Sequence, residues 1–159
     1  IGKDFDAHGE LASLGNVNNT LLDEFNKLEY YNLNMPKSLG KEYVDNNFLN
    51  IINASTLSIN DLLATFIEHI ACQISHTFLK YNISNALFTG GGVFNQYLIS
   101  RILNLTKTKL IIPNDDIVNF KEAIIFGFLG VLRVLNQNNC LGSATGASRD
   151  HSSGEIYLV

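Results

Sequence analysis

The sequence has 159 residues, a length that fits one domain with a sizeable buried core. Hydrophobic residues make up 46% of it and charged residues only 16%, and the net charge is −4. This acidic balance, with no basic stripe along the chain, argues against a nucleic-acid-binding protein. The scarcity of charge also indicates that part of the surface faces another domain or subunit.

The two cysteines, Cys72 and Cys140, lie far apart in the sequence, and no secretory signal precedes them. We therefore expect no disulfide scaffold and a reducing, cytoplasmic location. The sequence starts at Ile1 without an initiator Met, which favours a piece of a longer polypeptide.

The first half of the chain is predicted to form loops and helices. Residues 1–18 are expected to be loop-like, because Asp, Gly and Asn interrupt the apolar runs. Asn18 or Asn19 can cap a short helix that extends to Leu28. An irregular link follows over residues 30–40, where Pro36 pushes Met35 out of helical geometry, and a further helix is expected over 41–51.

The clearest helix is predicted over residues 58–80. Ser58 and Asp61 have capping-box spacing, and apolar residues then recur at helical intervals as far as Phe78.

The central stretch of the sequence is residues 86–95. The apolar run from Ala86 to Phe88 predicts a buried strand, three glycines then turn the chain, and Asn95 can cap a helix over about 96–105. The glycines are Gly90, Gly91 and Gly92. Such a turn lets the backbone approach a nucleotide or anion, but it is equally compatible with a tight turn that binds nothing. The spacing matches neither the dinucleotide fingerprint nor a P-loop.

A second buried strand is predicted over 109–112, ended by Pro113, so that strand, helix and strand form a right-handed parallel crossover. Asp115 and Asp116 resemble a polar turn.

The next helix, over about 119–135, is apolar almost all round, but its uncharged part is too short to span a bilayer. We expect this helix to be sandwiched between a sheet and other elements. Residues 143–148 are expected to be flexible, and 156–159 to form a short edge strand.

One flank of the 58–80 helix presents His69, Cys72 and His76 at spacings of three and four. Zinc uses such residues, but no fourth ligand is evident, and we interpret the three as the edge of the apolar face, so no metal site is predicted.

Glu122 is placed by the sequence in the first turn of the 119–135 helix. Two interpretations stay open: a carboxylate stabilised by the helix N-terminus, or one that hydrogen-bonds a sugar hydroxyl or a reacting water. Lys37 can meet a phosphate, although a single lysine in a loop is more often just solvated.

Several stretches, in one order, resemble the C-terminal half of anhydro-N-acetylmuramic acid kinases. They run along essentially the whole chain and are Asp6-x-x-Gly9-x-Leu11-Ala12-Ser13-x-Gly15, Pro36-Lys37-Ser38-x-Gly40-x-Glu42, Thr89-Gly90-Gly91-Gly92-x-x-Asn95-x-Tyr97-Leu98, Lys121-Glu122-Ala123-x-x-Phe126, Thr145-Gly146-Ala147-Ser148 and Gly154-x-Ile156-Tyr157.

The resemblance implies an α/β chain that is part of the second lobe of an actin/hexokinase-like (ribonuclease H-like) fold, with parallel strands and long flanking helices. It implies a cytoplasmic enzyme of cell-wall sugar recycling that uses ATP, Mg²⁺ and water to open 1,6-anhydro-N-acetylmuramic acid and phosphorylate its 6-oxygen. By this resemblance Gly90, Gly91, Gly92 and Asn95 line the adenosine side of the cleft, and Glu122 lies near the sugar.

The sequence also departs from the family pattern. Leu39 and Lys41 stand where Thr and Arg are more usual, and Phe94 replaces a frequent His. The family's N-terminal lobe, with its phosphate-binding segment and catalytic aspartate, has no counterpart, so residues 1–159 are expected to form a single lobe that is inactive alone. A lobe without its partner lobe exposes apolar surface, which favours association into a homodimer. The alternative is a non-catalytic binding or dimerisation module with an actin-like fold.

Overall fold

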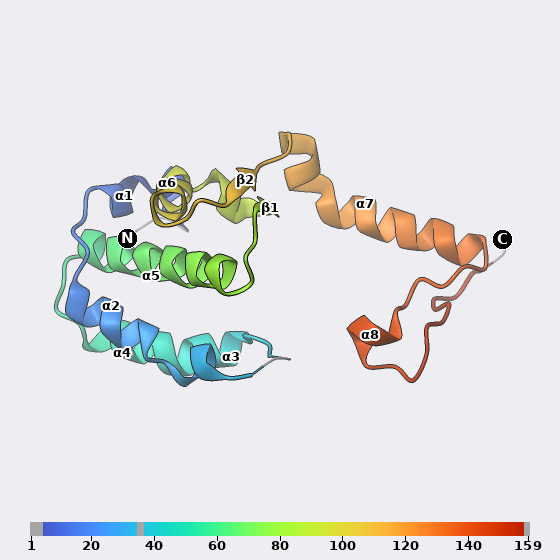
Figure 1. Cartoon of the computed structure of the whole chain (residues 1–159), viewed down its shortest axis with the longest axis horizontal. Coiled ribbons are helices and arrows are strands. Elements are labelled where there is room, and N and C mark those ends of the chain that lie inside the picture. Colours follow the sequence, from blue (N-terminus) through green and yellow to red (C-terminus); the bar gives the residue numbers. More distant parts are fainter. Residues whose placement is uncertain (1–4, 35–36, 158–159) are drawn as a thin grey trace. The chain divides into compact units, whose positions relative to one another are not determined.

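The computed structural model describes residues 5–34 and 37–157, which form two compact units, residues up to Ile112 and residues from Pro113 (Figure 1). The chain is α/β and mostly helical, with one two-stranded parallel sheet in the first unit. The prediction for Met35 lies outside the described residues. That residues 1–159 form a single domain stays a prediction.

The first described residues are helical, so the prediction of a loop over residues 1–18 is wrong for this part. A 3₁₀ turn, η1 (Ala7–Gly9), leads into a short helix, α1 (Glu10–Ser13). The Asp6 carboxylate accepts hydrogen bonds from the backbone N–H groups of Leu11 (2.9 Å) and Ala12 (3.0 Å), which closes these turns. The sequence alone suggested only that Asp6 interrupts an apolar run.

Helix α2 (Asn19–Asn26) begins where Asn18 caps it, since the Asn18 side chain accepts a hydrogen bond from the Leu21 N–H. A 3₁₀ turn, η2 (Glu29–Asn32), follows. The helix expected over 41–51 is present as three joined pieces: α3 (Lys41–Tyr43), a π-helical segment η3 (Val44–Phe48) and α4 (Leu49–Ala54).

Helix α5 (Ile59–Lys80) confirms the clearest sequence prediction and is the central element of the first unit. Ser58 caps it, as its hydroxyl accepts from the Asp61 N–H at 3.2 Å, while the Asp61 carboxylate accepts from the Ser58 hydroxyl and from the Asn16 N–H. Figure 1 shows α1 and α6 on one side of α5, and α2 and α4 on the other.

The buried core of the first unit is aromatic and lies between α5, α2 and the π-helical segment. Phe25 is fully buried, and its ring lies 5.5 Å from the ring of Phe48 and 5.6 Å from that of Phe66. Leu21 completes the buried cluster. This packing joins three segments that are separate in the sequence.

Strands β1 (Asn85–Leu87) and β2 (Lys109–Ile111) pair in parallel, and α6 (Gln96–Leu105) connects them, which confirms the strand, helix and strand order. The prediction that both strands are buried is wrong for this chain: Leu87 is 65% exposed, and Ile111 and Ile112 are exposed as well. Apolar strands of a parallel sheet need cover on both faces, and a two-stranded sheet gives little of it.

In the second unit, α7 (Asp115–Val134) begins four residues earlier than expected. Asp115 and Asp116 form its first turn rather than a polar turn, because the Asn114 side chain accepts from the Ile117 N–H and caps the helix. The expectation that α7 is sandwiched is also wrong for this chain, since most of its apolar side chains are exposed, Phe126 by 71%.

The segment after α7 is held by short-range contacts. A short helix, α8 (Gly142–Thr145), lies between the two partners of an antiparallel bridge, Cys140 and His151, and the Asp150 carboxylate accepts from the Gly142 N–H. Residues 156 and 157 are not in a strand, and 158–159 lie outside the described residues, so the described part of the expected edge strand is absent. None of the described helices has the length and apolarity to cross a bilayer.

The aromatic core predicts which substitution unfolds the first unit. We expect Phe25→Ala to lower the free energy of unfolding by ~3–5 kcal/mol, because it removes a fully buried ring and leaves a cavity. Urea unfolding followed by circular dichroism measures this loss. The matched control is Phe5→Ala, because Phe5 is 72% exposed and its removal should cost less than about 0.5 kcal/mol. Equal effects of the two substitutions would contradict this core.

Candidate functional site

The glycine turn joins the carboxyl end of β1 to α6. After β1, the Phe88 N–H still donates to the Ile111 carbonyl (2.9 Å), and Gly90 then takes φ 83°, a conformation that L residues with side chains rarely adopt. The Val93 N–H donates to the Gly90 carbonyl and closes a 3₁₀ turn, η4 (Gly91–Phe94), which the buried Val93 side chain anchors. Strand, glycine turn and helix are therefore arranged as the sequence predicted.

The outer side of this turn is open. A Cβ atom placed on Gly90, Gly91 or Gly92 would meet no atom within 4 Å, and Gly91 and Gly92 are exposed. The first N–H groups of a helical turn have no partners within it, so they are free to bind a ligand that approaches the backbone. The bend can therefore accept a ligand without any movement of neighbouring side chains.

Asn95 caps the helix that follows the turn. Its Oδ1 accepts a hydrogen bond from the Leu98 N–H at 2.9 Å, which fixes the side chain at the start of α6. The side chain is half-buried, and its Nδ2 group makes no hydrogen bond with the described residues. Asn95 thus has a structural role, and its Nδ2 group can donate hydrogen bonds to a ligand.

Glu122 lies on the exposed surface of α7, about two turns from the start of the helix. The prediction that it lies in the first turn is wrong, because Asp115 and Asp116 occupy that turn, and the macrodipole effect fades beyond it. The interpretation of Glu122 as a carboxylate stabilised by the helix N-terminus therefore loses its basis. The glycine turn belongs to the first unit and Glu122 to the second.

His69 is a core histidine. It is 1% exposed, its Nδ1 lies 2.7 Å from the Asn26 side-chain oxygen, and its Nε2 lies 2.7 Å from the Tyr31 hydroxyl. Because the Asn26 oxygen only accepts, Nδ1 carries the proton and Nε2 accepts from Tyr31. Burial lowers the pKa of His69 to about 4 and raises that of Tyr31 to about 12, so both are neutral at pH 7.

Cys72 and His76 share a flank of α5 with His69, and both have features that oppose zinc binding. Burial raises the pKa of the Cys72 thiol, which opposes the thiolate that zinc requires, and His76 is exposed. Among residues 5–34 and 37–157 no group of three His, Cys, Asp or Glu side chains can hold a metal ion. His69 thus lies in the core rather than at the edge of the apolar face, Cys72 is half-buried and His76 is exposed.

Lys37 is engaged within the protein. Its Nζ donates to the carbonyl oxygens of Tyr30 (2.9 Å) and Tyr31 (3.3 Å) and lies 4.6 Å from the centre of the Tyr30 ring. The ammonium group thus caps the carbonyls of η2. A phosphate would have to compete with these three contacts, so the structure favours a structural role for Lys37.

Sequence reasoning missed an ion pair between α5 and α6, the helix that follows the glycine turn. Arg101 on α6 donates from Nε to one carboxylate oxygen of Glu68 on α5 (2.6 Å) and from Nη2 to the other (2.9 Å). Glu68 is buried. The two residues are 33 positions apart, and no local pattern in the sequence connects them.

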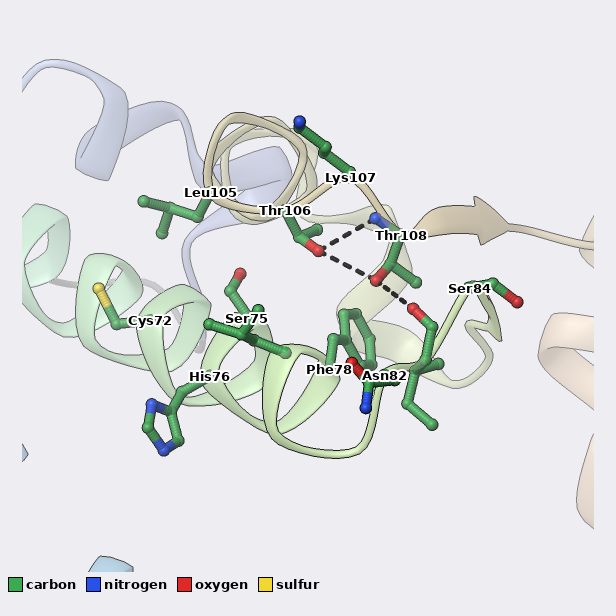
Figure 2. Close-up of a pocket in the computed structure, with 12 residues that line it drawn as sticks. Cys72, Ser75, His76, Phe78, Asn82, Ser84, Leu105, Thr106, Lys107 and Thr108 are labelled. Carbon is green, nitrogen blue, oxygen red and sulfur yellow. Dashed lines mark hydrogen bonds between the residues drawn. The ribbon is translucent and has the colours of Figure 1, made fainter.

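A cavity of about 630 Å³ lies between the end of α5 and the loop from α6 to β2 (Figure 2). The buried Ser75 hydroxyl lines it and has no hydrogen-bond partner among the described residues, while the Thr108 hydroxyl donates to the Ile83 carbonyl. Ser84 and Thr108 directly precede β1 and β2, so the cavity lies at the opposite end of the sheet from the glycine turn. A single water can satisfy Ser75, and the described lining offers no carboxylate.

Comparison with known proteins agrees with the resemblance seen in the sequence. The profile of the anhydro-N-acetylmuramic acid kinase family matches residues 1–159. Curated proteins of this name from Caldanaerobacter subterraneus subsp. tengcongensis, Crocosphaera subtropica and a Sulfurovum species are 32%, 33% and 33% identical to the chain. The matches cover 97%, 98% and 97% of this chain but 42%, 44% and 44% of the relatives. The chain therefore spans less than half the length of these relatives.

The lowered pKa of His69 predicts how stability depends on pH. The unfolded chain binds a proton at His69 near pH 6.5 and the folded chain only near pH 4, so the unfolded state holds more protons in this window and stability is lost as the pH falls. We expect His69→Gln to weaken this dependence by up to ~1.4 kcal/mol per pH unit. Urea unfolding between pH 6.5 and 4 measures it.

The matched control is His76→Gln, which replaces an exposed histidine on the same helix and so reports the effect of losing a histidine outside the core. A wild-type protein and a His69→Gln variant with the same slope would mean that His69 is not held neutral in the core.

Proposed function

The chain belongs to the anhydro-N-acetylmuramic acid kinase family, and on this premise we propose that it is the C-terminal part of an ATP-dependent sugar kinase. The parent enzyme uses ATP and water to convert 1,6-anhydro-N-acetylmuramic acid into N-acetylmuramic acid 6-phosphate, in the cytoplasmic recycling of cell-wall sugar. This chain supplies the adenosine side of the nucleotide cleft.

We propose the actin/hexokinase-like architecture for the parent, with this chain as part of its second lobe. The parallel pair β1 and β2, the crossover helix α6 and the long helices α5 and α7 support this proposal. The exposed Leu87 and Ile111 support it too, because a parallel sheet of two strands becomes stable only when more strands or helices cover it.

The observation that carries the proposal is the open glycine turn at the carboxyl end of β1. Ligands of open α/β sheets bind beyond the carboxyl ends of the strands. Here the three glycines leave the backbone uncovered, and the N-terminus of α6 follows. Backbone N–H groups at such a place favour electron-rich atoms of a nucleotide. Gly90, Gly91, Gly92 and Asn95 are the residues we assign to ATP, with the Nδ2 group of Asn95 as a donor.

Glu122 is the residue we assign to the sugar. Its exposed carboxylate has no ion-pair partner among the described residues, so it is free to accept hydrogen bonds from sugar hydroxyls. A hydrogen bond to a charged group positions a substrate more strongly than one between neutral groups.

We assign no catalytic residue to this chain. Activation of water needs a general base. Transfer of the γ-phosphoryl group needs a phosphate-binding loop and Mg²⁺. We place these groups in the rest of the parent enzyme. The chain alone would then bind nucleotide without turning it over. An actin-like module that only binds or dimerises is the alternative, and the following experiments separate the two.

The open space around Gly91 gives a sharp test of nucleotide binding. We expect Gly91→Leu to leave the melting temperature of the free protein unchanged, because the new side chain meets no protein atom at its Cβ. It should weaken ADP binding by at least ~10-fold, because the side chain occupies the ligand's place. Calorimetry of the full gene product with ADP measures this. Unchanged ADP affinity in Gly91→Leu would show that the turn is only structural.

The role of Glu122 is tested by the isosteric change Glu122→Gln in the full gene product. We expect kcat/KM for the anhydro sugar to fall ~10–100-fold, the usual effect of losing a hydrogen bond to a charged group. The matched control is Asp116→Asn, which removes a carboxylate from the first turn of the same helix and should leave kcat/KM within about twofold. Equal activity of Glu122→Gln and wild type would remove the sugar-binding role.

A further inference from the structure

The segment that precedes α1 lies directly against the end of the glycine turn. Gly9 has φ 76°, and a Cβ atom placed on it would lie 2.3 Å from Oδ1 of Asn95 and 2.7 Å from Cβ of Tyr97. These distances are far shorter than van der Waals contact. Only glycine therefore allows η1 to approach the start of α6 this closely.

His8 makes a second contact with the same place. Its Nδ1 lies 3.1 Å from the carbonyl oxygen of Phe94, and because a carbonyl only accepts, the ring donates from Nδ1. The backbone of His8 has φ 56°, which is uncommon for a residue with a side chain. The two Asp6 hydrogen bonds to Leu11 and Ala12 hold this left-handed pair of residues in place.

The contacts of His8 and Gly9 are made with Phe94 and Asn95, the two residues that end the glycine turn. The Phe94 carbonyl accepts from His8, and the Asn95 oxygen that caps α6 is the atom nearest to the Gly9 position. On the outer side of the turn, a Cβ atom placed on Gly90, Gly91 or Gly92 would meet no atom within 4 Å, so the contacts that orient the turn come from its ends. At its helix end the turn is thus oriented by a segment more than eighty positions away in the sequence.

We propose that Gly9 and His8 are positioning residues for the nucleotide: they set the orientation of Asn95 and of the glycine turn toward the adenosine. The proposal rests on the proposed function, because it assumes that ATP binds at this turn. A small displacement of binding groups weakens binding and catalysis strongly, even when the fold is preserved.

Two glycine substitutions test the proposal in the full gene product. Gly9→Ala pushes the new methyl group into Asn95, whereas Gly15→Ala pushes one into the Asn60 carbonyl oxygen, 2.0 Å away at the start of α5. Both should lower the melting temperature. Only Gly9→Ala should raise KM for ATP and the dissociation constant of ADP, by ~10-fold or more, whereas Gly15→Ala should leave both within about twofold.

His8→Ala keeps the test decisive if Gly9→Ala does not fold. It removes one exposed hydrogen bond, so it should change stability little and raise KM for ATP by ~3–10-fold with kcat preserved. Its control is His76→Ala, an exposed histidine on α5. Wild-type KM for ATP and wild-type ADP affinity in His8→Ala, and in Gly9→Ala if that variant folds, would overturn this inference alone. Failure of the wild-type protein to bind ADP would instead overturn the proposed function.

Discussion

The ion pair between Glu68 and Arg101 is the constraint on which the geometry of the candidate site depends. Both carboxylate oxygens of a buried glutamate are held by one guanidinium group, which fixes the direction as well as the distance between α5 and α6. Loss of one partner would leave a buried charge unpaired, at a cost of about 3–5 kcal/mol. Since the glycine turn leads directly into α6, the position of the turn follows from this pair.

The exposed apolar surfaces of the chain have a common cause. The sheet leaves Leu87 and Ile111 exposed, and α7 exposes most of its apolar side chains. A globular protein rarely leaves so many apolar side chains on a helix and on a sheet without covering them. The chain spans less than half the length of its curated relatives. Under the proposed function, the rest of the parent enzyme, or a second copy of this chain, covers these surfaces.

Local signals in the sequence predicted the starts of three helices, α2, α5 and α6, where a capping side chain was recognised. Asn18, Ser58 and Asn95 each accept the hydrogen bond that their positions imply. The start of α7 was predicted too late, although Asn114 followed by two aspartates is a signal for a capped helix with an acidic first turn. Asp115 and Asp116 were instead interpreted as a polar turn after Pro113, so the helix was expected to begin near Asn119.

Contacts between distant segments could not be predicted in the same way. The pairing of Glu68 with Arg101 and the approach of Gly9 to Asn95 depend on how helical segments pack against each other. Neither the periodicity of apolar residues nor a capping residue carries information about this packing. The buried strands were expected because their residues are apolar, yet burial depends on what covers them. The sequence predicted the glycine turn of the candidate site, but not the residues that hold it.

The hydrogen bonds around His69 have a consequence for how α2 aligns with α5. The Asn26 oxygen at the end of α2 accepts from both His69 and Gln73, and the other side of the His69 ring accepts from Tyr31. Contacts between aromatic rings alone would allow α2 to shift along α5. A shift of one helical turn, however, would leave several polar groups buried without hydrogen-bond partners. The chain therefore encodes a single alignment of these two helices.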